Sequence, residues 1–141
     1  NGDLPYDYLV LATGARYATD TAEWWNDSIY EFYSPPGADR VAKALEKFEG
    51  GTICVSIADI PYKCPPAPIE AAMLLDDYFK KKKMRDKVKI VYTSPLSRAF
   101  AIETTNIRVE QYLKEKDIET KTLFNVDDVD TEEKNYLFHG G

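Results

Sequence analysis

The chain alternates between short continuous apolar runs and longer stretches in which apolar residues recur at helical spacing. Continuous apolar runs are typical of strands buried in a parallel sheet, and they occur at residues 6–13, 52–57 and 88–92. Residues 38–48 and 69–84 place apolar side chains three and four positions apart, which predicts amphipathic helices. This alternation of strands and helices predicts an α/β fold built on a parallel sheet.

The last third of the chain predicts one more helix and a hairpin. A helix is expected over residues 106–116, with Asn106 as its N-cap. Residues 119–126 and 136–138 are predicted to be strands, and the acidic, turn-like residues 127–135 between them indicate a hairpin. From the second strand onward, the element order predicts a Rossmann-like half with two right-handed crossovers, three layers and a small antiparallel hairpin against the sheet.

Composition narrows the possible partners. The 141 residues fit one domain of ordinary size, and 44% apolar residues can form a core. A net charge of −6 argues against nucleic acid as a partner, because neutralising phosphates requires a basic face. The sequence has no apolar stretch of about 18 residues, the length that a membrane-spanning helix needs. With His139 as the single histidine, no metal site is predicted.

Several other features set expectations for the structure. The first residues carry no initiator Met and no leader, so we expect a piece of a longer protein. The aromatic, irregular residues 15–37 are expected to dock on a neighbouring surface. Glu70 is expected to cap the helix that it begins, with an approach to a cofactor as the alternative. The remaining charges are expected on solvated faces: Glu23, Asp27, Asp76, Asp77 and residues 80–83.

The turn after the second strand carries the candidate chemistry. Dinucleotide-binding proteins place glycines at such a strand-to-helix turn, so that the backbone can contact a pyrophosphate. Here no glycine occurs between Gly51 and Gly140, and the turn holds Cys64 instead. Lys63 and the approaching helix N-terminus both favour the thiolate form of Cys64. Pro65 and the other prolines of the turn restrict the backbone and remove amide donors. By contrast, Cys54 lies mid-strand and is expected to be a small buried hydrophobe.

Two segments resemble known flavoproteins. Residues 4–16, with the sequence LPYDYLVLATGAR, resemble the segment by which flavoproteins with two dinucleotide-binding domains close the first pass through their FAD domain. The resemblance implies that Ala12, Thr13 and Gly14 lie near the flavin nucleotide. It also implies that residues 1–37 are the end of the FAD-domain segment plus a linker, and that residues 38–141 form the Rossmann-like second domain, of the NAD-binding type.

Residues 61–72, with the sequence PYKCPPAPIEAA, resemble the sulfide:quinone oxidoreductase and flavocytochrome c sulfide dehydrogenase family, as do residues 83–88 after the helix. The resemblance implies that Cys64 is the first of two redox cysteines, that Pro65 lies beside FAD, and that the second cysteine belongs to the C-terminal part of the protein. Sulfide would be captured as a persulfide, and two electrons would pass to FAD and then to a quinone or a haem.

These implications define the expected function. We expect a fragment of an FAD-dependent sulfide:quinone oxidoreductase that by itself neither binds FAD tightly nor turns over. The complete protein is expected to be a peripheral membrane protein on the cytoplasmic side, attached through a C-terminal part, and a homo-oligomer is compatible with this expectation. The alternatives are an NAD(P)H-dependent flavin oxidoreductase, of the type II NADH dehydrogenase or coenzyme A disulfide reductase type, and a non-catalytic redox or interaction module. In the isolated chain, residues 8–12 are expected to fill a vacant position in a sheet, either of the same chain or of a neighbouring copy.

Overall fold

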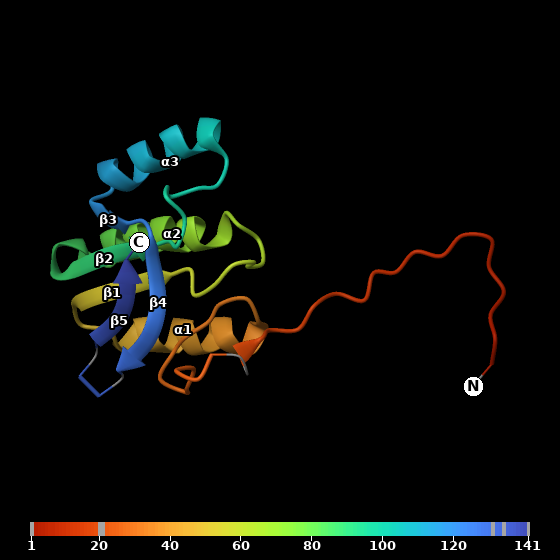
Figure 1. Ribbon diagram of the computed structural model, residues 1–141. Helices are drawn as coiled ribbons and strands as arrows, with labels where there is room; N and C mark the ends of the chain where they lie inside the picture. The colour runs from red at the N-terminus through yellow and green to blue at the C-terminus, as the bar shows by residue number, and fades with distance from the viewer. Residues whose placement is uncertain (1, 20–21, 131, 134, 141) are drawn as a thin grey trace.

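A computed structural model describes residues 2–19, 22–130, 132–133 and 135–140. It confirms an α/β fold with a parallel sheet (Figure 1). The elements follow in the order α1 (Pro35–Lys47), β1 (Gly51–Ser56), α2 (Ala67–Lys81), the short 3₁₀ helix η2 (Arg85–Lys87), β2 (Val88–Thr93), α3 (Glu103–Glu115), β3 (Ile118–Lys121), β4 (Phe124–Asp130) and β5 (Asn135–Gly140).

The parallel sheet has the strand order β1-β2-β3. In its register Ile53 is opposite Ile90, and Ile90 is opposite Ile118. The connections run through α2 and α3, as parallel neighbours require. The turn that leads from β1 into α2, which holds the cysteine, therefore lies at the carboxyl end of this sheet, where open α/β folds place their functional loops.

The hydrophobic core lies on one face of the sheet. Side chains alternate between the faces of a strand, and the core-facing set packs against α2 and α3. This core includes Val55, Ile90, Tyr92 and Ile118 of the strands, Ile69, Ala72 and Phe79 of α2, and Leu113 of α3. The opposite face of the sheet is polar near the amino ends of the strands, where Thr52, Lys89 and Glu119 lie on β1, β2 and β3. One well-packed face therefore holds the strands and helices together.

Helix α1 begins three residues earlier than predicted. Ser34 is its N-cap, and the Ser34 hydroxyl accepts a hydrogen bond of 3.0 Å from the Gly37 amide. Pro35 and Pro36 occupy the first helical positions, where a missing N–H costs nothing. The helix ends before Gly50 and Gly51, whose φ angles of 142° and 120° favour glycine.

Helix α3 also begins early, and the prediction that Asn106 caps it is wrong. The N-cap residue is Ile102, and it makes no capping hydrogen bond through its side chain. Asn106 lies inside the helix, where its Oδ1 accepts a hydrogen bond of 2.8 Å from the amide of Phe100. The Asn106 side chain therefore pairs with a backbone amide of the loop before α3, and it does not cap the helix. Local sequence does not distinguish these two roles.

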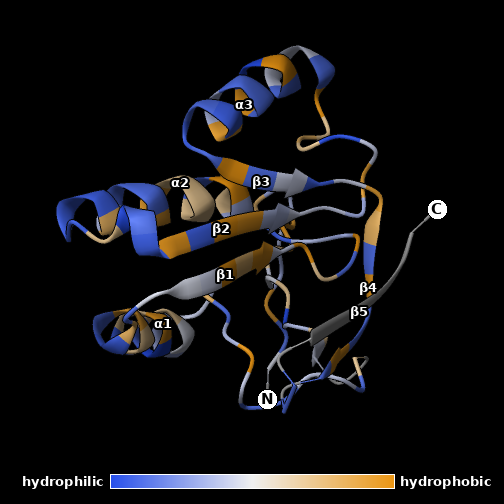
Figure 2. Ribbon diagram, turned by 90° about the vertical axis from the view of Figure 1, so that its left-hand side faces the viewer, coloured by the Kyte–Doolittle hydropathy of each residue, from blue (hydrophilic) through white to orange (hydrophobic). Residues whose placement is uncertain are grey.

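The predicted strand over residues 119–126 is two strands. The chain leaves the parallel sheet after Lys121 and turns at Leu123, which has a φ of 54°. It then forms the antiparallel hairpin β4–β5, which lies beyond the carboxyl ends of the parallel strands in Figure 2. The hairpin was predicted, but residues 127–130 belong to β4 and not to the turn. Asp127 and Asp128 are exposed at the register shift of this hairpin, where solvent accepts their charges.

The predicted strand at residues 6–13 is wrong. Residues 2–19 form no strand, and the part of this segment before Ala15 extends away from the domain in Figure 1. Tyr8 is 94% exposed and Val10 is 85% exposed, so the expected filling of a sheet position by residues 8–12 does not occur within this chain. A strand exists only when a neighbour completes its hydrogen-bond ladder, and no strand among the described residues pairs with this segment.

The prediction that the remaining charged residues lie on solvated faces is wrong for Asp76. The side chain of Asp76 is completely buried, and it contacts Lys80, Arg85 and Lys116. Its neighbour Asp77 is half-exposed and pairs with Lys81, as the prediction had it. Within the described residues, no helix combines the length and the apolar character that crossing a membrane requires.

Candidate functional site

Cys64 is exposed on the turn between β1 and α2. Its φ of 47° is in the left-handed region, which is uncommon for a residue other than glycine and often marks functional turns. The carbonyl oxygen of Cys64 accepts a hydrogen bond of 2.9 Å from the Ala67 amide, which closes the turn onto the first residue of α2. The backbone of the turn is thus fixed while the thiol faces solvent.

The prolines of this turn leave few backbone donors near the thiol. Pro65, Pro66 and Pro68 have no N–H group, and the Ala67 amide is already donated to the Cys64 carbonyl. A pyrophosphate needs several convergent amides at a helix N-terminus, so this turn does not suit a dinucleotide. No side-chain hydrogen bond caps α2, and Glu70 lies exposed in its first turn, where its carboxylate complements the helix dipole.

Lys63 brings the two predicted site segments together. Its Nζ donates a hydrogen bond of 2.7 Å to the carbonyl of Ala15, and it lies 4.2 Å from the centre of the Tyr17 ring. Ala15 directly follows Ala12, Thr13 and Gly14, which are exposed. Gly14 has a φ of 74° and open space where a Cβ would point. The Ala-Thr-Gly turn and the cysteine turn are therefore joined by one hydrogen bond, although 48 positions separate its partners.

A group of tyrosines packs behind the cysteine turn, and sequence reasoning did not identify it. The rings of Tyr17 and Tyr33 are 6.4 Å apart, and Phe32 stacks on Tyr33 at 5.1 Å. The hydroxyl groups of Tyr33 and Tyr62 are buried and have no hydrogen-bond partner among the described residues. The aromatic content of residues 15–37 was the available signal: this segment does dock on a surface, and the surface includes the cysteine turn.

Burial changes the acidity of these phenols. Burial raises the pKa of Tyr33, and the negative charges of Cys64, Tyr62 and Tyr17 raise it further. Burial alone raises the pKa of Tyr62. Burial also raises the pKa of Tyr92, whose hydroxyl donates to the Ala99 carbonyl at 2.8 Å. These three phenols therefore stay protonated at neutral pH and can act as hydrogen-bond donors.

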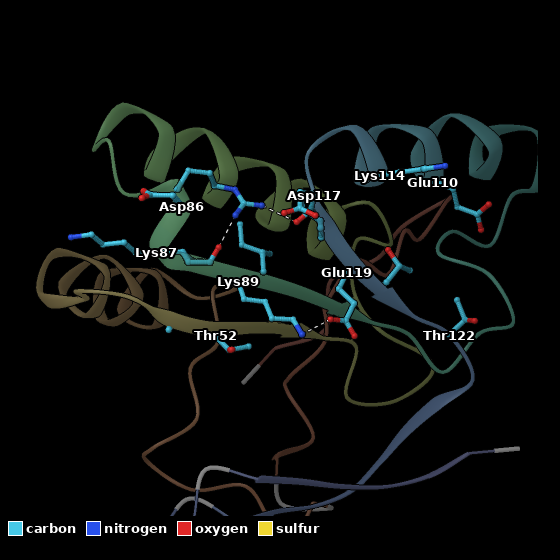
Figure 3. A pocket seen from close by; sticks show the side chains of 15 residues that line it. Thr52, Asp86, Lys87, Lys89, Glu110, Lys114, Asp117, Glu119 and Thr122 are labelled. Carbon is cyan, nitrogen blue, oxygen red and sulfur yellow. Dashed lines mark hydrogen bonds and ion pairs between the residues drawn. The ribbon is translucent and has the colours of Figure 1, made fainter.

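Two other features lie outside this site. Cys54 is half-buried in β1, where the sequence predicted full burial. A hollow of about 1040 Å³ opens over the polar half of the sheet, where Figure 3 shows Thr52, Lys89 and Glu119. The Lys89 and Glu119 side chains pair at 2.6 Å. None of the predicted site residues lines this hollow, so we place the candidate site at the cysteine turn and not there.

The parallel sheet β1-β2-β3 with its helical crossovers α2 and α3 defines a Rossmann-like domain, which carries an exposed cysteine on its first strand-to-helix turn in place of a glycine loop. The family model described as the central part of the flavoprotein chain of sulfide dehydrogenase (flavocytochrome c) matches residues 40–135, which include Cys64. The chain therefore belongs to the sulfide:quinone oxidoreductase and flavocytochrome c sulfide dehydrogenase family.

Curated relatives agree with this assignment. The chain is 23% identical over 141 residues to the mitochondrial sulfide:quinone oxidoreductase of Mus musculus, and 22% identical over 142 residues to that of Dictyostelium discoideum. Each match covers 96% of this chain and 31% of the relative. The chain thus spans about a third of the length of the curated relatives that it matches.

Solved structures confirm the Rossmann-like fold. The sulfide:quinone oxidoreductase of Aquifex aeolicus superposes with a TM-score of 0.72 at 20% identity, over 96% of this chain and 34% of that one. An NAD-dependent persulfide reductase from A. fulgidus superposes with a TM-score of 0.61 at 21% identity, over 96% and 23% respectively. At 20% and 21% identity, the structural similarity supports the fold alone. The reaction has to be argued from the residues of the candidate site.

Proposed function

We propose that this chain is the second, Rossmann-like domain of an FAD-dependent sulfide:quinone oxidoreductase. In this proposal the complete protein oxidises sulfide through a persulfide on Cys64 and passes two electrons by way of FAD to a quinone. The observation that carries the proposal is the Lys63–Ala15 hydrogen bond of 2.7 Å, because it holds the exposed cysteine turn against the Ala-Thr-Gly turn.

The residues at this junction suit contact with a flavin. Gly14 presents backbone with open space at its Cβ position, and Ala12, Thr13 and Pro65 are exposed. We assign these four residues to cofactor contacts and residues 1–37 to the end of the FAD-domain segment plus a linker, with residues 38–141 as the second domain. FAD, when bound by the complete protein, would supply the two-electron acceptor. The exposed apolar residues 8–11 would then belong to a sheet of the FAD domain.

The chemistry of Cys64 follows from thiol–disulfide exchange. In the resting protein Cys64 would form a disulfide with a second cysteine from another part of the polypeptide. Hydrosulfide attacks the Cys64 sulfur, a new S–S bond forms there, and the second cysteine leaves as a thiolate. Cys64 then carries the sulfane sulfur. The proline-rich turn keeps this sulfur in place, which an attack along a defined line requires.

The proposal includes the surroundings of the complete protein. Quinones partition into lipid, so the complete protein would be a peripheral membrane protein, which we place on the cytoplasmic side. Its membrane contact would come from sequence outside this chain, and a homo-oligomer is compatible with the proposal. Nucleic acid is not a proposed partner, because the chain carries a net charge of −6.

The test uses the complete protein, purified with its flavin. Cys64→Ser should reduce sulfide-dependent quinone reduction by at least about a hundredfold, as expected for loss of the sulfur that forms the covalent intermediate, while the flavin absorbance stays unchanged. The matched control Cys54→Ser, in the middle of β1, should keep near-normal turnover. Normal sulfide oxidation by Cys64→Ser would overturn the proposal. Tight NADH binding with NADH-dependent quinone reduction would instead favour the NAD(P)H-dependent flavin oxidoreductase.

A further inference from the structure

One ammonium group joins the cysteine turn to the segment that enters the domain. Lys63 Nζ donates a hydrogen bond of 2.7 Å to the carbonyl oxygen of Ala15, and the same atom lies 4.2 Å from the centre of the Tyr17 ring. An ammonium group carries three donors, so it can hold the carbonyl and face the ring together. Hydrogen bonds from charged donors are stronger than neutral ones, and a cation over an aromatic face adds to the attraction. Together these two interactions form the Lys63 contact.

The Lys63 contact lies where the chain leaves the domain. Residues 2–14 are exposed and contain no helix or strand, and this segment extends away from the domain in Figure 1. After it, the Tyr17 ring lies 6.4 Å from the Tyr33 ring, which stacks on Phe32 at 5.1 Å. Phe32 in turn packs against the hydrophobic core. The entering segment is therefore attached to the domain at the Lys63 contact.

The other side of the contact is a closed turn. Lys63 directly precedes Cys64, whose carbonyl accepts a hydrogen bond of 2.9 Å from the Ala67 amide. The prolines of this turn restrict its backbone further. On the entering segment, Ala15 directly follows the Ala-Thr-Gly turn. Any movement of Ala15 relative to Lys63 therefore moves the Ala-Thr-Gly turn relative to the cysteine turn.

These interactions give Lys63 a role that its place in the sequence does not suggest. The sequence puts its charge next to Cys64, where a cation favours the thiolate. In the described part of the chain, the ammonium group makes its contacts with Ala15 and Tyr17. A side chain engaged in this way acts on the geometry of the junction between the two turns.

We propose that Lys63 is a positioning residue whose ammonium group holds residues 15–17 against the cysteine turn. Because the Lys63 contact joins both turns of the candidate site, it fixes the Ala-Thr-Gly turn relative to the cysteine turn. The inference rests on the proposed function in one respect: in the complete protein, the contact would set the position of Cys64 relative to the flavin. A misplacement of about 1 Å can lower the rate of a reaction by about a hundredfold.

Limited proteolysis of the full chain tests the Lys63 contact directly. Trypsin cleaves after the exposed Arg16, which lies between the two residues that Lys63 contacts. Cleavage of a held segment requires local opening, and its rate follows the population of the open form. Lys63→Met should therefore release residues 1–16 about tenfold faster than the parent, as expected for loss of a charged hydrogen bond. Mass spectrometry at short digestion times measures the released peptide.

Two variants are controls for this assay. Lys63→Arg keeps a charged donor that can also face the Tyr17 ring, so its rate should stay within about twofold of the parent. Lys81→Met removes another exposed lysine, which pairs with Asp77 at 2.7 Å, and should leave cleavage at Arg16 unchanged. None of these substitutions alters the residues on either side of the cleaved bond. The proposal is overturned if Lys63→Met releases the peptide at the parent rate, or if Lys81→Met accelerates release equally.

In the complete protein, the proposal predicts a difference between the two half-reactions of the flavin, which rapid mixing follows by absorbance. Lys63→Met should slow flavin reduction by sulfide by at least about tenfold, because Cys64 and the flavin are then misplaced. Oxidation of the chemically reduced flavin by quinone does not involve Cys64 and should stay near the parent rate. Lys63→Arg should restore the reduction rate. Equal slowing of both half-reactions by Lys63→Met would overturn the positioning role.

The two assays separate this inference from the proposed function. Proteolysis uses no flavin, sulfide or quinone, so after a negative result there the proposed function is still decided by the turnover of Cys64→Ser. Conversely, a complete protein whose flavin is not reduced by sulfide would refute the proposed function. Protection of the Arg16 bond by Lys63 would support the positioning role in that case as well.

Discussion

Arg85 Nε donates a hydrogen bond of 2.8 Å to Oδ1 of the fully buried Asp76. The same guanidinium group donates to the carbonyls of Val88, Lys116 and Asp117, at 2.6, 2.8 and 2.8 Å. The pair thus joins α2 to the start of β2 and to the turn between α3 and β3. Two further cations, Lys80 and Lys116, contact Asp76 Oδ2. This cluster holds the helical layer at the end of the sheet opposite the cysteine turn.

Asp76→Asn should destabilise the protein strongly. Loss of one partner of a buried ion pair costs about 3–5 kcal/mol. Lys80 and Lys116 remain partly exposed, so we expect about 3 kcal/mol. Urea unfolding at neutral pH measures this difference. The control is Asp77→Asn, which removes a half-exposed partner of Lys81 and should cost less than about 1 kcal/mol. Equal stabilities of the two variants would contradict the proposed role of the cluster.

The contribution of Asp76 should also depend on pH. Burial raises the pKa of Asp76, but hydrogen bonds from Lys80, Lys116 and Arg85 outweigh burial and lower the pKa from 3.8 to about 2. A lowered carboxyl pKa stabilises the folded state at pH values above 3.8, by about 2 kcal/mol here. This stabilisation is lost as the pH falls through about 2. The difference in unfolding free energy between the parent and Asp76→Asn should therefore shrink as the pH falls from 3.8 to about 2. A constant difference would show that the lowered pKa of Asp76 is not the source of this stabilisation.

Arg85→Lys should also be destabilising, although it conserves the charge. A lysine ammonium group is a point charge on a flexible stem and does not reproduce the planar fork that reaches Asp76 and three carbonyls together. Each carbonyl left without its donor costs about 1 kcal/mol, so we expect a loss of about 2 kcal/mol by urea unfolding. Lys87→Arg, on the exposed end of η2, is the charge-conserving control and should be neutral. Wild-type stability of Arg85→Lys would show that charge alone suffices.

The two cysteines should differ in reactivity in the folded chain. Cys64 is exposed, whereas Cys54 is half-buried in the middle of β1. A cysteine can attack a disulfide reagent only when its own sulfur is accessible. A chromogenic disulfide should therefore react in a fast phase with Cys64 and in a slow phase of equal amplitude with Cys54. Cys64→Ser should remove the fast phase and leave the slow one. A single phase for the folded parent would contradict the placement of these thiols, and unfolding in urea should merge the two phases.

Gly37→Ala should destabilise the start of α1. A Cβ atom at this position would lie 1.9 Å from Glu31 Oε1 and 2.5 Å from the Glu31 carbonyl oxygen. Displacing Glu31 would weaken its bonds to the amides of Tyr33 and Ser34, so we expect a loss of about 1–3 kcal/mol despite the higher helix propensity of alanine. Thermal unfolding measures the loss. Gly2→Ala has nothing within 4 Å and should leave the midpoint unchanged.

The strands and helices of the core could be predicted from the spacing of apolar residues. The runs at 52–57 and 88–92 became β1 and β2, and the helical spacing at 69–84 became α2. The run at 6–13 has the same local pattern but forms no strand, because a ladder partner comes from elsewhere in space and not from the run itself. Local pattern therefore indicates what a segment can form, and pairing decides whether it does.

The sequence by itself determined the parallel α/β arrangement and the cysteine turn, because periodicity and proline act over a few residues. The tertiary structure decided which distant groups meet. It buried Asp76 among three cations, joined Lys63 to Ala15, and brought the ring of Tyr17 to that of Tyr33. In each case the deciding quantity is desolvation or contact between segments far apart in the chain, and a local pattern of apolar and polar residues does not contain it.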